Sequence, residues 1–381
     1  MNSAQTPFPL DALRQGQLDE NQMRELLQSA SEQAEPAHIV FEIADHLSHA
    51  LLLAQRHAEA RDVAAQALQL GQDPALLHTL ALSEHALGES KTGISHLEQA
   101  LQQLDGAGDD ESAAMRGDML EHLAQMQQSQ AQYLRALQSL ERAAALRLIS
   151  GEHSEYIRCK SQLAQLAHQL GDSMQASEHW LDILALARQE NLNADAARAL
   201  LQLADLAKEG ENVEAETSLR REAIDVLATA GMSRELARTL AQIARQENRR
   251  ELMWQAVWLM FAAAQDIEGL INAHAWLFMR EEQKTDRDAA LLAAAVWALI
   301  ENTPDERISQ DPGQVARTKR LAISHLFSCA RMQGIHETEI TRWMELEKLR
   351  REDRVIPTML IRIENMLKNE AWLFKGEELI Q

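Results

Sequence analysis

The sequence contains few of the residues that interrupt helices or favour β-sheet cores. Among its 381 residues there are 7 prolines, 15 glycines and only 4% aromatic residues. No proline occurs between Pro74 and Pro304. Because proline and glycine destabilise helix interiors and aromatic residues are enriched in strands, this scarcity favours a helical chain.

Cysteine and positive charge are also scarce. The two cysteines, Cys159 and Cys329, cannot form a disulfide framework, and lone thiols fit a reducing compartment. The chain has 37 Lys plus Arg against 58 Asp plus Glu, which gives a formal net charge of -21. Since nucleic acids and anionic lipids are bound mainly through Lys and Arg, we expect no nucleic-acid partner.

Long hydrophobic runs are missing. The most apolar window, Ala289–Ile300, has 12 residues, whereas a membrane-spanning helix needs roughly 20. The N-terminal residues contain no basic stretch followed by an apolar one, so they do not resemble a secretory signal. We therefore expect no membrane insertion and a cytoplasmic location.

The apolar residues that are present follow a helical period. They recur at i, i+3, i+4 and i+7, as in Leu163, Leu166 and Leu170, and no strand-like alternation is found. Breaks divide the chain into helices of roughly 12–20 residues. The length is compatible with two or three domains or with one extended array.

A repeat of about 40 residues runs through the middle of the chain. The pattern Leu-Ala-x-hydrophobic begins at Leu123, Leu163 and Leu203, 40 residues apart, and again at Leu240 after 37 residues. Upstream, Leu80-Ala81 and Leu47-Ser48 begin similar segments. Small residues stand 13 positions after Leu47, Leu80, Leu123 and Leu163, at Ala60, Gly93, Ala136 and Ala176. Small residues on facing helices allow two backbones to approach closely in a hairpin, and stacked hairpins bury one another's apolar faces.

The motifs Leu163-Ala164, Leu170-Gly171-Asp172, Ala176 and Trp180, with this spacing, resemble tetratricopeptide (TPR) repeats over roughly residues 42–282. The units near 40 residues are similar to the longer-helix variety of the family. The resemblance implies an all-α fold, a right-handed superhelical solenoid of antiparallel helix pairs. The chain departs from the family in that aliphatic residues replace most of its Tyr and Trp positions.

Composition divides the chain into three parts. We expect an N-terminal helical cap at 1–35, TPR-like helical repeats at 36–301, and a C-terminal degenerate repeat with capping helices at 302–381. The last expected helix, near 357–374, has a broad apolar face. It could cover the open end of the solenoid or form a homodimer contact.

Sequence motifs for catalysis and cofactor binding are missing. There is no Gly-x-Ser-x-Gly, no glycine-rich phosphate loop, no Cys-x-x-Cys and no His-Glu-x-x-His. The best metal candidate is His46 with His49, near Glu42 and Asp45, but this spacing is more typical of a polar helix surface. We expect no enzymatic activity, catalytic residue, metal or cofactor.

The resemblance implies a concave wall lined by the first helix of each repeat, at positions -5, -2, +2 and +5 from the anchor leucine. In the first of these repeats the positions hold Asp118, Glu121, Gln125 and Gln128. The predicted partner-binding residues are Arg158, Gln165, His168, Arg198, Asp205, Lys208, Arg238, Gln242 and Arg245. The planar arginine fork suits carboxylates, so an acidic peptide segment would fit. The alternative is that these arginines pair with acidic residues of neighbouring helices.

Trp254 and Trp258 are candidates for a hydrophobic contact with a partner or a second copy. They are separated by one helical turn in a segment that is apolar nearly all round. That composition equally favours burial between neighbouring helices.

We therefore expect a noncatalytic protein- or peptide-binding TPR scaffold that acts as an adaptor, chaperone or regulatory protein in a bacterial-type cytoplasm. The alternative is a ligand- or peptide-responsive regulator, similar to peptide-sensing TPR proteins, that compacts on binding. Residues 1–190 carry a net charge of -15 and residues 191–381 a net charge of -6. An acidic ligand should therefore favour the central and C-terminal groove.

Overall fold

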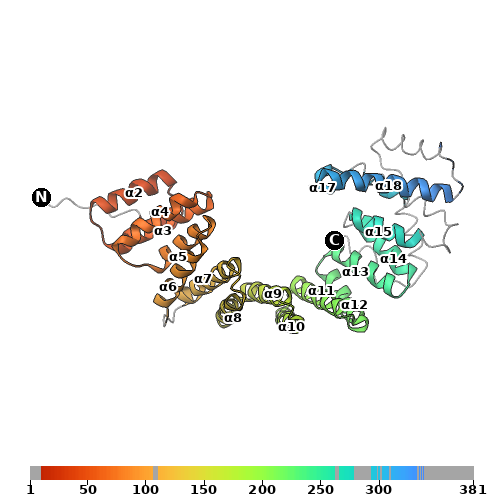
Figure 1. Cartoon of the computed structure of the whole chain (residues 1–381), viewed down its shortest axis with the longest axis horizontal. Helices are drawn as coiled ribbons and strands as arrows, with labels where there is room; N and C mark the ends of the chain where they lie inside the picture. Colours follow the sequence, from red (N-terminus) through yellow and green to blue (C-terminus); the bar gives the residue numbers. More distant parts are fainter. Residues whose placement is uncertain are drawn as a thin grey trace. The chain divides into compact units, whose positions relative to one another are not determined.

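A computed structural model describes residues 10–105, 110–261, 266–278, 293–297, 299–300, 303–308, 310–332, 334, 336 and 338. Within these ranges every regular element is a helix and no strand occurs (Figure 1). The prediction of an all-α chain is therefore confirmed. The expected C-terminal helices beyond residue 338, including the proposed dimer or capping helix, lie outside the described residues.

The chain divides into two compact units, Met1–Leu186 and Ala187–Gln381. The first contains α1 (Leu10–Arg14), α2 (Glu20–Glu32), α3 (Ala37–Leu53), α4 (His57–Ala67), the 3-10 turn η1 (Leu68–Leu70), α5 (Pro74–Ala86), α6 (Ser90–Gln103), α7 (Asp110–Ser129), α8 (Tyr133–Ile149), α9 (His153–Gln169) and most of α10 (Ser173–Gln189). From α2 to α9, each helix packs mainly against the helices before and after it in the chain.

The second unit contains α11 (Asn193–Glu209), α12 (Val213–Thr229), α13 (Ser233–Gln246), α14 (Arg250–Leu259), α15 (Ile267–Phe278), α17 (Asp305–Ile308) and α18 (Pro312–Met332). Here α11 packs on α12, α12 on α13, and α13 on both α14 and α15. The three-part division at residues 35 and 301 rests on composition rather than on packing, and it stays a prediction.

The repeated spacing of small residues has a direct structural cause. Ala60, Ala136 and Ala176 are fully buried, each on the second helix of a hairpin. At Gly93 on α6, an added Cβ would lie 2.8 Å from the carbonyl oxygen of Ala81 on α5. The two backbones are therefore close enough to exclude even a methyl group at this position.

The anchor leucines fill the interior beside these close contacts. Leu163 and Leu240 are 0% exposed, and Leu123 and Leu203 are almost as deeply buried. Burial of a leucine contributes about 1.5–3 kcal/mol to folding. Because each hairpin supplies one such leucine, much of the stability is distributed along the chain.

The turn inside the α9–α10 hairpin depends on glycine. Gly171 adopts φ +83°, and the amide of Asp172 donates to the carbonyl of Ala167 at 2.9 Å. This pairing is the Schellman arrangement that ends a helix, and glycine adopts the required left-handed conformation without steric cost. Asp172 then accepts a hydrogen bond from the amide of Gln175 at 3.0 Å, at the beginning of α10.

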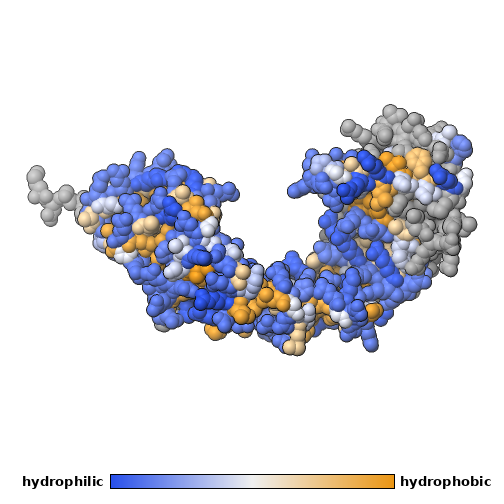
Figure 2. Space-filling model, viewed as in Figure 1, coloured by the Kyte–Doolittle hydropathy of each residue, from blue (hydrophilic) through white to orange (hydrophobic). Residues whose placement is uncertain are grey.

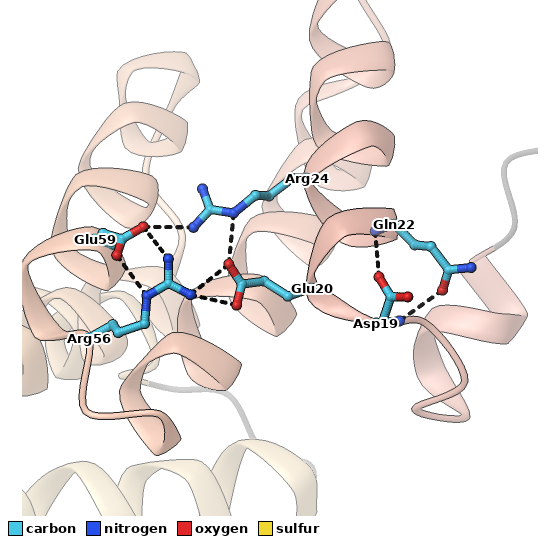
Figure 3. A network of polar contacts seen from close by, with 6 residues as sticks. All are labelled: Asp19, Glu20, Gln22, Arg24, Arg56 and Glu59. Carbon is cyan, nitrogen blue, oxygen red and sulfur yellow. Dashed lines mark hydrogen bonds and ion pairs between the residues drawn. The ribbon is translucent and has the colours of Figure 1, made fainter.

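At the N-terminus, polar contacts attach α2 to α4 (Figure 3). Asp19 and Gln22 form a capping box, with reciprocal hydrogen bonds of 2.9 and 2.8 Å. The ion-paired residues of the network are Glu20, Arg24, Arg56 and Glu59, with nitrogen–oxygen distances of 2.6–2.9 Å. All four are partly exposed, so their contribution is to orientation more than to stability.

Most of the surface in the view of Figure 2 is hydrophilic, in keeping with the composition. Exposed apolar side chains include Leu134, Ile149 and Met174, each more than two-thirds exposed. No helix in the described ranges is both long enough and apolar enough to cross a membrane.

Candidate functional site

A groove of about 320 Å³ lies between α7 and α9, the first helices of two successive hairpins. Its lining residues are Asp118, Glu121, His122, Gln125 and Gln128 from α7 and Arg158, Gln162, Gln165, Leu166 and Gln169 from α9. Six of these ten occupy the inward positions that the repeat register predicts. The structure thus brings Arg158 and Gln165 together, whereas His168 is exposed on α9 and does not line this groove.

Five glutamines give the groove its chemical character. Gln125, Gln165 and Gln169 are exposed, and Gln128 and Gln162 are half-buried. Within the described part of the chain, none of the five carboxamides is hydrogen-bonded to another protein group. A carboxamide both donates and accepts, so the groove offers many hydrogen-bonding groups to a ligand.

The register missed Gln162 and Gln169, although a signal was present. Together with Arg158 and Gln165 they occupy positions i, i+4, i+7 and i+11 of α9. This spacing follows one face of a helix. A search for polar stripes, rather than for fixed offsets from the anchor leucine, would have found both residues.

One end of the groove is charged. Arg158 contacts Glu121 with both terminal nitrogens, at 2.6 and 3.1 Å. Glu121 is only 6% exposed and also lies 3.4 Å from Arg147 on α8. Arg147, itself 4% exposed, bonds to Asp118 and to Glu152, the residue before α9. The charged cluster of two arginines and three carboxylates therefore carries a net charge of -1.

The glycine at position 117, which has no side chain, leaves space for this cluster. An added Cβ on Gly117 would lie 2.7 Å from the guanidinium of Arg147. The charged cluster therefore depends on a glycine in the first half of α7 as well as on its charged members.

A pair of histidines lies next to the groove. Nε2 of His78 on α5 is 2.9 Å from Nδ1 of His122 on α7, so one ring donates to the other. Burial lowers the pKa of His78 to about 4, helped by the neighbouring His122. Burial also lowers the pKa of His122, against the opposing effect of Asp118. Both rings are therefore neutral near pH 7.

Acidification should destabilise the first unit through this pair. The folded pKa of His78 lies below its unfolded value of 6.5. The unfolded state therefore binds more protons as the pH falls from 6.5 towards 4, and stability decreases across that window. We expect a larger drop in the urea midpoint between pH 7.5 and pH 5 for the parent chain than for His78→Gln. An equal pH effect in the parent chain and in His78→Gln would contradict this assignment.

A second groove, of about 180 Å³, lies in the second unit, between α13 and the first half of α15, with Met260 at the end of α14. It is lined by Arg238, Ala241, Gln242, Arg245, Met260, Glu268, Gly269 and Asn272. Arg238 makes a bidentate pair with Asp266 at 2.6 and 2.9 Å and lies 3.2 Å from Glu268. The hydrogen bonds that Arg238 donates to Asp266 raise the pKa of Arg238.

The other two predicted residues of this groove differ in pairing. Gln242 donates to Glu216 at 2.7 Å. Arg245 contacts no carboxylate among the described residues, and partial burial lowers its pKa. Of the predicted arginines in the groove, Arg245 is thus the one whose charge is not already matched by a described neighbour.

The remaining predicted residues lie on α11 and line neither groove. Arg198 is 64% exposed and pairs with Asp195 of its own helix at 3.0 Å. Asp205 accepts a hydrogen bond from Arg220 at 2.6 Å. Lys208 is exposed and forms no ion pair within the described ranges. Arg158 and Arg238 pair with acidic residues outside their own helices, which was the alternative to a free ligand site, whereas Arg198 pairs within α11.

The two tryptophans on α14 differ in accessibility. Trp254 is 2% exposed, among neighbours that are also buried, whereas Trp258 is half-buried. Only Trp258 could reach a partner without a change in the packing of α14. A hydrophobic contact at this helix stays a prediction.

The thiol of Cys159 and the metal-ligating side chains form no reactive or metal-binding arrangement among the described residues. Cys159 is fully buried, and burial raises the pKa of its thiol to about 12, so it is protonated at neutral pH. In the parts of the chain that the structure describes, no three His, Cys, Asp or Glu side chains are grouped so that they could hold a metal ion.

No protein-family model matches the chain, and no curated protein matches it in sequence. Solved structures similar to it include the C-terminal part of a TPR repeat-containing protein from Cytophaga hutchinsonii, at 11% identity and a TM-score of 0.48, covering 71% of this chain and 98% of that one. BtubC from P. vanneervenii is 16% identical with a TM-score of 0.43, covering 59% of this chain and 93% of that one.

The apo form of the quorum sensor NprR from B. thuringiensis is 12% identical with a TM-score of 0.39, covering 89% of this chain and 95% of that one. In this chain itself, the 40-residue period, the buried Leu-Ala anchors and the close helix hairpins coincide. The chain is built from TPR-like helical repeats.

Proposed function

We propose that this chain is a noncatalytic scaffold of the cytoplasm that holds an extended segment of a protein or peptide in the α7–α9 groove, as an adaptor, chaperone or regulatory protein. The observation that carries the proposal is a set of five glutamines in one groove whose carboxamides have no hydrogen-bond partner among the described residues. An extended peptide presents alternating N–H and C=O groups, and each carboxamide can satisfy one of each. Binding through the main chain would tolerate many ligand sequences.

The groove also has the shape that such a ligand needs. Its lining residues extend over eleven positions of α7 and twelve of α9, which is roughly 15 Å along a helix. An extended chain covers this length with about five residues. Leu166 provides an apolar contact in an otherwise polar lining.

The second groove supports a different ligand, an acidic segment of a partner. Its lining residues include two arginines and one glutamate, and Arg245 has no described carboxylate partner. An acidic segment of a partner would supply a carboxylate for the Arg245 fork. We therefore propose α13, rather than all the predicted arginines, as the contact for the predicted acidic partner.

A random dodecapeptide library, selected on the full chain and sequenced, tests the glutamine groove. Peptides that bind should lose about fivefold in affinity on Gln165→Met and more on the Gln125→Met, Gln165→Met double variant, because each change removes about one neutral hydrogen bond. Met keeps the side-chain length and lacks the amide. Affinities would be measured by fluorescence anisotropy.

Two controls make the result specific. Gln138→Met changes an exposed glutamine on α8 that does not line the groove, and it should leave binding unchanged. N-methylation of the peptide backbone at alternate residues should weaken binding even though the side chains are intact. A library that yields no peptide sensitive to Gln125 and Gln165 would overturn the proposal.

A further inference from the structure

Resting on the proposed function, we infer that the α7–α9 groove selects a segment with a basic side chain placed at Asp118. The groove is chemically asymmetric along its length. Asp118 and Arg158 are the first lining residues along α7 and α9, whereas Gln128 and Gln169 are the last, at the C-terminal ends of these helices. In this proposal the glutamines bind the main chain of the ligand, and the end of the groove with Asp118 and Arg158 determines which ligand side chain is accepted.

Arg158 is not available to an incoming carboxylate. Both of its terminal nitrogens are held by Glu121, which is 6% exposed. An acidic ligand would have to displace Glu121, and that carboxylate would remain buried with fewer partners. Leaving a buried charge without compensation is costly, so an acidic side chain is disfavoured here.

Asp118, in contrast, can accept further hydrogen bonds. Its side chain is 52% exposed, and Oδ1 accepts from Arg147. Among the described residues, Oδ2 has no hydrogen-bonding partner. A lysine or arginine from a ligand would complete the coordination of this carboxylate and neutralise the net charge of -1 on the charged cluster.

The surrounding charges act in the same direction. Residues 1–186 hold 11 Lys plus Arg and 26 Asp plus Glu, which gives a net charge of -15. Such a field attracts a basic segment and repels an acidic one before contact. His122, which lines the groove beside Asp118, is neutral near pH 7 and does not oppose the ligand's charge.

The test uses the same dodecapeptide library on the full chain. Peptides that depend on Gln125 and Gln165 should be enriched in Lys or Arg at one position. Replacing that residue with a neutral isostere, citrulline for arginine, should weaken binding to the parent chain about tenfold, the size expected for one hydrogen bond to a charged group. On Asp118→Asn the same peptide change should have little effect, so that the two substitutions form a double-mutant cycle.

A matched control exists in the second unit. Asp205 is 54% exposed and accepts from Arg220, which is 5% exposed; Asp118 is 52% exposed and accepts from Arg147, which is 4% exposed. Asp205→Asn therefore makes the same chemical change in the same local setting, outside the groove. It should leave the citrulline effect intact.

The outcomes separate the two proposals. If peptides depend on the glutamines but show no basic preference, or show an acidic one, the inference fails and the proposed function stands. If Asp205→Asn reduces the citrulline effect as much as Asp118→Asn does, the preference arises from overall charge, and the inference again fails. If no peptide depends on the glutamines, the proposed function itself fails.

Discussion

Replacing Arg147 with alanine is expected to lower the free energy of local unfolding of α7–α9 by about 3–5 kcal/mol, the range for breaking a buried ion pair by removing one partner. Arg147 is 4% exposed and contacts three carboxylates from α7 and from the start of α9. Glu121 would be the most affected, because it is itself buried. Hydrogen exchange of the amides in α7, α8 and α9 measures this free energy segment by segment.

Arg135→Ala is the control for charge and helix propensity. Arg135 is exposed on the same helix and contacts no described carboxylate, so its loss should change the opening free energy by no more than about 0.5 kcal/mol. Arg147→Lys keeps the charge but loses the planar fork, and it should fall between the two. If the amides of α7–α9 are equally protected from exchange in the Arg147→Ala and Arg135→Ala variants, the charged cluster does not hold these helices together.

Replacing Gly93 with alanine is expected to destabilise the α5–α6 hairpin by about 1–3 kcal/mol, the usual cost of overpacking. The new methyl group would lie 2.8 Å from the backbone oxygen of Ala81 and 3.1 Å from the sulfur of Met126. A side chain can rotate away, but the backbone of α5 cannot move without disturbing its own packing. The urea midpoint of the first unit, followed by hydrogen exchange in α5 and α6, reports the change.

Gly210→Ala is the matched control. Gly210 follows α11 with φ -77°. The nearest atoms to an added Cβ are 3.5 Å away, which is an ordinary contact. Alanine there should be neutral or slightly stabilising because it reduces the freedom of the unfolded chain. Equal effects of the two substitutions, each measured on the unit that contains it, would show that the α5–α6 backbones have room for a methyl group.

Packing between helices that are consecutive in the chain was predictable from the sequence. Each hairpin joins two helices that are adjacent in the chain. The spacing of residues such as Leu163, Ala176 and Gly93 therefore indicates which positions of the two helices pack together. The inward register correctly grouped Gln125 and Gln165 because a straight helix keeps its faces aligned over several turns.

The charge pairing could not be predicted in the same way. Arg147 reaches Asp118 across 29 positions of sequence, from the second helix of the hairpin, and no periodic pattern marks it as a buried residue. Arg238 and Arg245 are two turns apart on one helix, yet only Arg238 meets Asp266, which precedes α15 outside any regular repeat. Such pairs depend on where separate segments approach one another, and the spacing within one helix does not determine that.

The contact between Gly117 and Arg147 links two positions that are 30 residues apart and lie on different helices. A lineage that acquired a larger residue at 117 first would pass through a protein with a steric clash, and one that shortened the residue at 147 first would pass through a protein with unmatched buried carboxylates. Either path crosses a less stable intermediate. The two positions should therefore drift as a pair over evolutionary time, and a glycine at 117 should accompany an arginine at 147.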